Sequence, residues 1–201
     1  MGDTGVRLMI YDVTQGALTG AWYAGGALYR LMRRIDAVHG ARNWDEALAW
    51  AAATQPDRPI AEIQIWAHGR WGSVSLDGER MTDASLADGH AHRPRLDALR
   101  ERMTPESLWW FRTCETFGAD SGQRFARAWT DFFGCRAAGH TYIVADWQSG
   151  LHSLAPGATP SWDRSEGLKE GTPDAPKKAR YSRPWAPNTI HCLRGALPSG
   201  L

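Results

Sequence analysis

Short apolar runs alternate along this chain with segments of helical periodicity. Runs rich in β-branched and aromatic residues are typical of buried strands, whereas apolar residues recurring every three or four positions indicate one face of a helix. The apolar runs occupy residues 7–13, 60–67, 108–113 and 141–146. The helical pattern occupies residues 28–35, 43–51, 96–103 and 121–134. This alternation predicts an α/β domain with a mostly parallel central sheet and helices on both faces.

Local signals set the limits of several of these elements. Asn43 is a good N-cap for the second helix, and Asp120 or Ser121 is the candidate N-cap of the fourth. Gly40 is expected to end the first helix. The alternating residues 73–76 precede Asp77-Gly78, and this order favours a hairpin between the second strand and the third helix.

The composition changes at Pro156. Residues 156–188 hold six prolines and the basic patch 177–180. Such a segment predicts an extended wrap over the domain rather than a second core. We therefore expect residues 1–155 to form the α/β domain and residues 156–201 to form a Pro-rich C-terminal wrap of the same domain. Residues 188–193 are a candidate late edge strand.

Composition and charge narrow the range of partners. The 201 residues are 43% apolar and carry a net charge of +1, which argues against a nucleic-acid partner. No apolar run reaches the ~18 residues of a membrane span, and residues 1–6 lack the basic region of a signal peptide. Three cysteines make an odd number without framework spacing, so free thiols and a cytoplasmic location are expected.

Two of the apolar runs are each followed at once by one reactive side chain. Residues 60–67 lead into His68-Gly69, and residues 108–113 lead into Cys114. If the two strands are parallel neighbours, their carboxyl ends open on one crevice, where open α/β sheets bind ligands. An imidazole can lower the pKa of a thiol or move its proton, and the thiolate is the nucleophile. Gly69 lacks Cβ, so substrate can approach its backbone closely, and its N–H is a candidate oxyanion donor.

This order of strand, His-Gly, strand and Cys resembles the caspase–gingipain–legumain superfamily of cysteine peptidases. In caspases the His precedes the Cys by about 50 residues, and here the separation is 46. The resemblance covers roughly residues 6–150 and implies a caspase-like three-layer sandwich. It implies that His68 is the general acid/base, that Cys114 is the nucleophile of a Cys/His dyad, and that the N–H groups of Gly69 and Cys114 form the oxyanion hole. It implies a peptide or protein substrate and no cofactor.

The residues around the thiol depart from the caspase pattern. Gln-Ala-Cys, followed by a small or polar residue and Gly, is replaced by Arg112-Thr113-Cys114-Glu115-Thr116. The chain therefore resembles a divergent, bacterial-type member. A carboxylate at Glu115 is expected to raise the pKa of the neighbouring thiol, and Arg112 is expected to lower it.

Candidate substrate-binding residues give opposite predictions for the residue before the cleaved bond. Asp12 and Asp146, each at the end of a predicted strand, favour Lys or Arg there, although each is equally open to interpretation as a solvated strand end. Arg112 occupies the place of a pocket residue in caspases and favours an acidic residue. Trp147, directly after Asp146, is a candidate for lining the groove.

Other interpretations of the same residues stay open. An ordinary buried thiol beside a turn histidine gives a caspase-fold domain without catalysis, which would serve as a binding module. Another thiol-dependent acyl hydrolase would use the same two side chains. His140 and His152 are rivals to His68 as the base.

Two further motifs bear on cofactors and activation. His90 and His92 alternate in a polar loop, but no further ligands complete a site, so no metal is predicted. A peptidase of this kind is open to activation by a protein partner, and residues 177–180 are a candidate self-cleavage loop.

Overall fold

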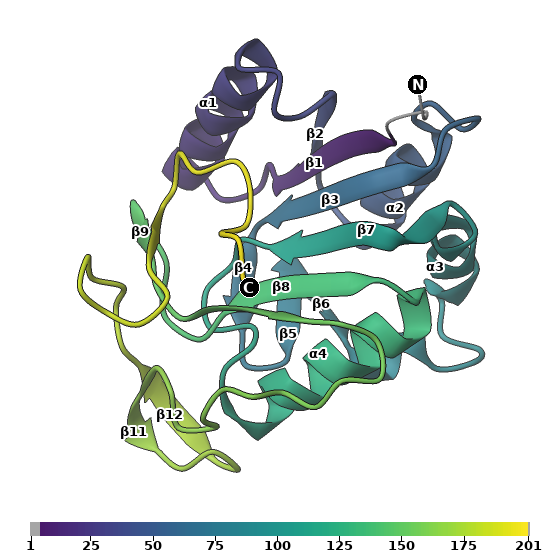
Figure 1. Cartoon of the computed structure of the whole chain (residues 1–201). Helices are drawn as coiled ribbons and strands as arrows, with labels where there is room; N and C mark the ends of the chain where they lie inside the picture. Colours follow the sequence, from purple (N-terminus) through teal and green to yellow (C-terminus); the bar gives the residue numbers. More distant parts are fainter. Residues whose placement is uncertain (1–4, 201) are drawn as a thin grey trace.

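Six strands form the central sheet of the computed structural model, which describes residues 5–200 (Figure 1). They lie in the order β10-β8-β7-β3-β1-β2. β10 is antiparallel to β8, and the other neighbours pair in parallel. The predicted α/β class with a mostly parallel central sheet is confirmed. The strands are β1 (Val6–Asp12), β2 (Ala37–Ala41), β3 (Ile60–Trp66), β7 (Met103–Phe111), β8 (Arg136–His140) and β10 (Leu151–Leu154).

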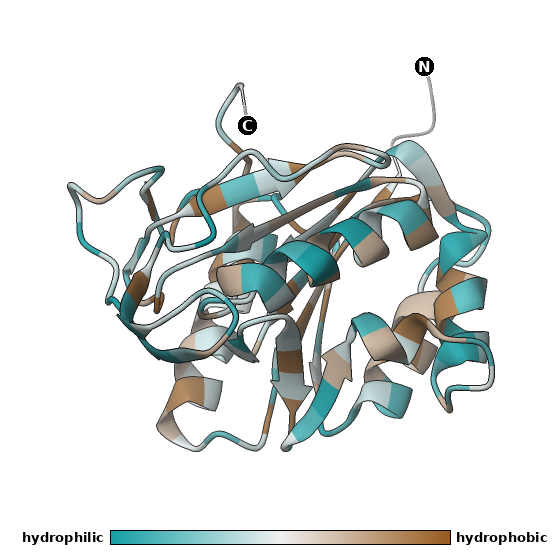
Figure 2. Ribbon diagram, turned by 90° about the horizontal axis from the view of Figure 1, so that it is seen from below, coloured by the Kyte–Doolittle hydropathy of each residue, from teal (hydrophilic) through white to brown (hydrophobic). Residues whose placement is uncertain are grey.

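Helices cover both faces of this sheet because successive strand residues point to opposite sides. Leu8, Ile63 and Trp109 belong to one apolar cluster with the buried residues of α2, α3 and α4. Met9 and Trp66 belong to another cluster, on the face that α1 covers. The helices show bands of hydrophilic and hydrophobic residues, as amphipathic elements should (Figure 2). Their bounds are α1 (Ala17–Leu31), α2 (Trp44–Ala53), α3 (Arg93–Arg100) and α4 (Ala119–Phe133).

A small antiparallel sheet follows β3 directly. It consists of β4 (His68–Arg70), β5 (Ser73–Leu76) and β6 (Glu79–Thr82), and the 3-10 helix η1 (Asp83–Leu86) follows it. The hairpin predicted at Asp77-Gly78 is confirmed, with both residues at positive φ.

Asn43 is also confirmed as the N-cap of α2, since its side chain accepts a hydrogen bond from the N–H of Glu46 at 2.9 Å.

The C-terminal part contains short strands rather than an open wrap alone. β11 (Leu168–Gly171) pairs with β12 (Pro176–Ala179), and β13 (Ile190–His191) pairs with β9 (Trp147–Gln148). The predicted late strand at residues 188–193 is thus present in shorter form. The basic residues expected in a loop at 177–180 fall mostly within β12.

Three element predictions are wrong. Residues 37–41 form β2 instead of ending a helix, and α1 starts eleven residues earlier than the periodicity indicated. The strand predicted at 141–146 is a connection, while the true neighbour of β7 is β8. Gly118, rather than Asp120 or Ser121, is the N-cap of α4.

Packing explains why the sequence did not predict β8. Its residues are mostly small, and small residues carry a weak strand signal. Gly139 must be small, because a Cβ there would lie 2.5 Å from the ring of Phe117. The tertiary contact therefore selects a residue that local propensity disfavours.

The sequence predicts neither a membrane span nor a signal peptide. Within residues 5–200, no helix is long and apolar enough to cross one. The prediction that the chain starts without a signal peptide concerns residues 1–6, of which residues 1–4 lie outside the described part.

A buried guanidinium fastens the C-terminal tail to the sheet. Arg112 follows β7 and is 3% exposed. A guanidinium has five N–H donors, and here it makes five hydrogen bonds. The acceptors are Gln148 Oε1, which accepts two, the hydroxyl of Tyr29, and the carbonyls of Cys192 and Arg194. The planar group also lies 4.9 Å from the ring centre of Trp66 and 4.5 Å from that of Trp110.

Arg112→Leu is expected to lower the free energy of unfolding by about 2–4 kcal/mol, because buried Gln148 Oε1 loses two donors and the part-buried carbonyls of Cys192 and Arg194 each lose one. Residues 192–194 should become accessible to limited proteolysis. The matched control is Arg95→Leu, whose guanidinium forms an exposed pair with Asp45 at 3.0 Å, and it should cost less than about 1 kcal/mol. Equal losses in denaturant titrations of the two variants would contradict a special role for Arg112.

Candidate active site

The carboxyl ends of β3 and β7 lie side by side. The strands pair in parallel up to Ile65 opposite Phe111, and the N–H of Arg112 continues the pairing with the carbonyl of Ile65 at 3.0 Å. His68 lies two residues beyond β3, and Cys114 lies three residues beyond β7. Both line one cavity of about 490 Å³, a volume within the usual range for ligand sites. We call it the His68–Cys114 cavity.

Glycine at position 69 brings the two chain segments together. A Cβ at Gly69 would lie 2.4 Å from the carbonyl oxygen of Cys114 and 2.3 Å from Oγ1 of Thr116. No other residue type fits without displacing the turn that carries the thiol. The close approach that Gly69 permits is therefore that of the Cys114 turn, whereas sequence analysis assigned it to substrate.

His68 is exposed at the mouth of the cavity. Its ring meets the edge of Trp22 from α1, with ring centres 5.9 Å apart and planes at 76°. The side chain is thereby held beside solvent and beside the thiol's cavity, which is where a group that exchanges protons with a substrate must lie.

Cys114 is partly buried, with Sγ 3.9 Å from the carbonyl oxygen of Val144. Burial raises the pKa of this thiol, the charge of Glu115 raises it further, and backbone hydrogen bonds at Val144 and Cys114 itself oppose the shift. The expected effect of Glu115 thus has the predicted direction. In the free protein the thiol is protonated at neutral pH, so attack requires a base.

Glu115 is itself in an unusual environment. It has a φ of +46°, which is uncommon for a residue other than glycine, and it is 7% exposed. Burial raises the pKa of its carboxyl to about 6, against the attraction of Arg70. Oε2 of Glu115 has no hydrogen-bond partner within residues 5–200. The carboxyl therefore changes charge in the physiological pH range, next to the thiol.

The other two cysteines are also free thiols, in different settings. Cys135 is buried in the main core, and burial raises its pKa to about 12. Cys192 lines the His68–Cys114 cavity; burial and the charge of Asp146 raise its pKa, while Arg112 lowers it. Cys135 is thus an unreactive internal reference for measurements on Cys114.

The predicted substrate-binding residues divide into two groups. Arg112 and Asp146 line the cavity, Arg112 buried and Asp146 exposed. Asp12 does not: it is fully buried, and its carboxylate accepts hydrogen bonds from the turn after β1 and from the N–H of Asp77. Trp147 is 40% exposed and packs edge-on against His191 instead of lining the cavity.

The rival histidines lie elsewhere. His140 is fully buried, its Nδ1 lies 3.1 Å from the carbonyl of Ser149, and burial lowers its pKa to about 3. His152 is paired with Glu166 at 2.8 Å and stacks on Trp162. Neither is among the residues that line the cavity around Cys114.

Sequence analysis missed the apolar wall of the cavity. Trp22, Gly25 and Tyr29 of α1 line it opposite the strand ends, and a Cβ at Gly25 would lie 2.7 Å from the ring of Trp66. The available signal was their spacing of three and four residues, typical of one helix face. It went unused because the helix was expected to begin later.

Within residues 5–200, no group of three or more His, Cys, Asp or Glu side chains is arranged so that it could hold a metal ion. His92, one of the two alternating histidines, has Nε2 2.6 Å from Oε1 of Glu79.

No protein-family model matches the sequence, and no curated protein matches it significantly.

Proposed function

We propose that this protein is a cysteine peptidase with a caspase-like fold, in which Cys114 is the nucleophile and His68 transfers protons. The observation that carries the proposal is the shared cavity: two neighbouring parallel strands each deliver one of these side chains to it. This is the placement that the resemblance to the caspase–gingipain–legumain superfamily implies for its Cys/His dyad. The strand arrangement and the helices on both faces support the same fold.

The raised pKa of Cys114 defines the order of proton transfer. His68 removes the proton of the thiol as Sγ attacks the substrate carbonyl carbon. The imidazolium then protonates the leaving amine, the C–N bond breaks, and a thioester remains on Cys114. His68 next takes a proton from water, which attacks the thioester and releases the acid, and the proton returns to sulfur.

Backbone N–H groups supply the oxyanion hole in this proposal. Those of Gly69 and Cys114 are the candidates, because the two residues are in contact through their backbones. The N–H of Glu115 is excluded from this role, since it donates to the carbonyl of Tyr142 at 2.9 Å. Fixed amide donors of this kind stabilise negative charge without reorganisation.

The cavity favours a basic residue before the cleaved bond. All five donors of Arg112 are engaged within the protein, so it has no free donor for an acidic side chain. Asp146 is the exposed carboxylate on the cavity wall. Apolar rings of Trp22, Tyr29 and Trp66 match the methylene stem of Lys or Arg.

A specific observation favours a second candidate, a non-catalytic interaction module. Burial and Glu115 both hold the thiol in its protonated form, and an inert cysteine has the same properties. The two functions differ in what Cys114→Ala does, because a binding module keeps its affinity after this change. A further thiol-dependent acyl hydrolase would differ from a peptidase only in the substrate that it accepts.

Cys114→Ala is expected to abolish hydrolysis of a fluorogenic peptide library, with a loss of at least about 10³-fold in kcat/KM. His68→Ala should lose activity to a similar extent, because the two groups act as a unit. Both substitutions are small changes at the cavity surface, so the thermal midpoint should be nearly unchanged. Full activity in Cys114→Ala would eliminate the thiol mechanism.

Glu115→Gln is expected to speed alkylation of Cys114 by iodoacetamide several-fold at pH 7–8. Removing a negative charge stabilises the thiolate and lowers the pKa of the thiol. Below about pH 6 the gain should disappear, because the wild-type carboxyl, with a pKa of about 6, is then neutral. Mass spectrometry reports the labelling of each cysteine, and Cys135 serves as the unreactive reference. A gain that is the same at pH 5 and pH 8 would contradict this electrostatic account.

Asp146→Asn is expected to reduce kcat/KM by about 10–100-fold for peptides with Lys or Arg before the cleaved bond, since a charge-assisted contact is lost. Peptides with an uncharged residue there should be affected much less. Asp57→Asn, before β3 at the other end of the sheet, is the matched control. A preference for acidic residues in the wild-type protein would instead point to Arg112.

A further inference from the structure

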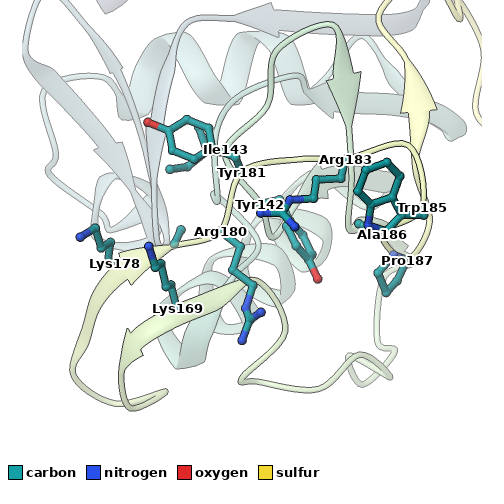
Figure 3. A pocket seen from close by; sticks show the side chains of 11 residues that line it. Tyr142, Ile143, Lys169, Lys178, Arg180, Tyr181, Arg183, Trp185, Ala186 and Pro187 are labelled. Atoms are coloured by element: carbon teal, nitrogen blue, oxygen red, sulfur yellow. The ribbon is translucent and has the colours of Figure 1, made fainter.

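A second cavity lies next to the chain segment that contacts Cys114. It has a volume of about 620 Å³ and is formed by the exit of β8, the β11–β12 hairpin and residues 180–187 (Figure 3). Four of its lining residues are cationic, and none of the described residues that line it is acidic. The cations are Lys169, Lys178, Arg180 and Arg183. We call this cavity the basic groove.

The positive charge of the basic groove is only partly compensated. Lys178 pairs with Glu170 at 3.3 Å on the hairpin surface, and Arg180 donates to the carbonyl of Leu168 at 2.9 Å. Within residues 5–200, neither Lys169 nor Arg183 has an ion-pair partner. Because the whole chain carries a net charge of only +1, this is a local concentration of positive charge, suited to an anionic ligand.

Aromatic residues accompany the cations. Tyr181 is 70% exposed and Trp185 is 78% exposed, while Tyr142 lies between the lysines of the hairpin and Trp185 (Figure 3). Exposed aromatic rings beside arginines are enriched at sites that bind other proteins. The combination indicates a ligand that offers both carboxylates and apolar side chains.

The walls of the basic groove are fixed to the connections between β8 and β10. Ser149, fully buried, donates its N–H to Oγ of Ser182 at 2.9 Å and accepts the N–H of Arg183 at 3.1 Å. Ile143 donates to the carbonyl of Arg180 at 2.9 Å and accepts from Ser182 at 2.8 Å. These bonds hold the cationic segment in place before any ligand binds, which reduces the entropy cost of binding.

The basic groove also adjoins the candidate active site along the chain. Ile143 lines the groove, and the next residue, Val144, lines the His68–Cys114 cavity and contacts Sγ of Cys114. A peptide of twelve residues spans about 40 Å when extended, which is enough to occupy both cavities. One chain can thus bind in the basic groove while another part of it lies at the thiol.

From these observations we infer that the basic groove binds an acidic segment, containing at least one apolar residue, of the protein that is cleaved at Cys114. The role in cleavage rests on the proposed peptidase function, whereas binding of the acidic segment does not. A polypeptide is favoured over single-stranded nucleic acid, because nucleic-acid sites follow a long phosphate backbone and require a broader basic surface than a net charge of +1 provides.

Binding is tested on the full chain carrying Cys114→Ala, by fluorescence anisotropy with three labelled probes. These are a twelve-residue peptide rich in Asp and Glu with one Leu and one Phe, its amide counterpart with Asn and Gln, and a twelve-nucleotide oligothymidylate. The acidic peptide should bind, weaken as salt rises, and bind at least about tenfold more tightly than the amide peptide. No binding of the acidic peptide, or tighter binding of the oligonucleotide, would overturn the inference.

Substitutions locate the site. Lys169→Glu and Arg183→Glu should each weaken acidic-peptide binding by about tenfold, and Trp185→Ala should weaken it without changing the salt dependence. Lys177→Glu is the matched control, because Lys177 is exposed on the same hairpin but does not line the groove; it should change affinity less than about twofold. Circular dichroism checks that each variant is folded. Equal effects of Lys177→Glu and Arg183→Glu would contradict a specific groove.

The kinetic test uses the active protein. Arg183→Glu should raise KM for a substrate that carries the acidic segment, leave kcat unchanged, and leave cleavage of a short substrate without that segment unaffected. An acidic peptide that binds to the Cys114→Ala protein while the active protein cleaves nothing would refute the peptidase function and leave the binding site standing. Cleavage that depends on Cys114 but is indifferent to the acidic segment would refute the groove's role.

Discussion

Parallel pairing between β3 and β7 is the constraint on which the candidate site depends. After a register shift between Ile60 and Glu62, the two parallel strands pair without interruption up to Ile65 opposite Phe111, so both chains leave the sheet at one edge. The hydrogen bond from Arg112 to Ile65 extends this pairing beyond β7. A slip of one residue would turn every side chain of β7 to the opposite face, and the thiol would no longer face the cavity that contains His68.

Arg112 is buried at this edge of the sheet and lines the His68–Cys114 cavity. Its five hydrogen bonds join the end of β7 to α1, to β9 and to the C-terminal tail, parts of the chain that are far apart in the sequence. Cation–π contacts with the rings of Trp66 and Trp110 partly compensate for removing the charge from water. The guanidinium that sequence analysis treated as a possible ligand for substrate has all five of its donors engaged within the protein.

The connection after β8 serves two cavities at once. Residues 142–146 follow the last parallel strand; the first two line the basic groove and the other three line the His68–Cys114 cavity. Val144 contacts the thiol through its backbone, whereas Tyr142 and Ile143 lie beside cations of which Lys169 and Arg183 have no ion-pair partner within residues 5–200. The proposed catalytic site and the proposed site for an acidic chain are thereby adjacent, and they share no lining residue among those described.

The sequence by itself determined the α/β class, the hairpin at Asp77-Gly78, and the positions of His68 and Cys114 at the ends of two strands, because strong apolar periodicity and turn chemistry are local properties. It did not determine β2 or β8. Their residues have low strand propensity, and they form strands because they pair with β1 and β7. It also assigned Asp12 to the substrate, although the carboxylate is used within a turn. Only the tertiary structure decided which charged groups are free and which are engaged, since that depends on contacts between residues such as Arg112 and Cys192 that lie 80 positions apart.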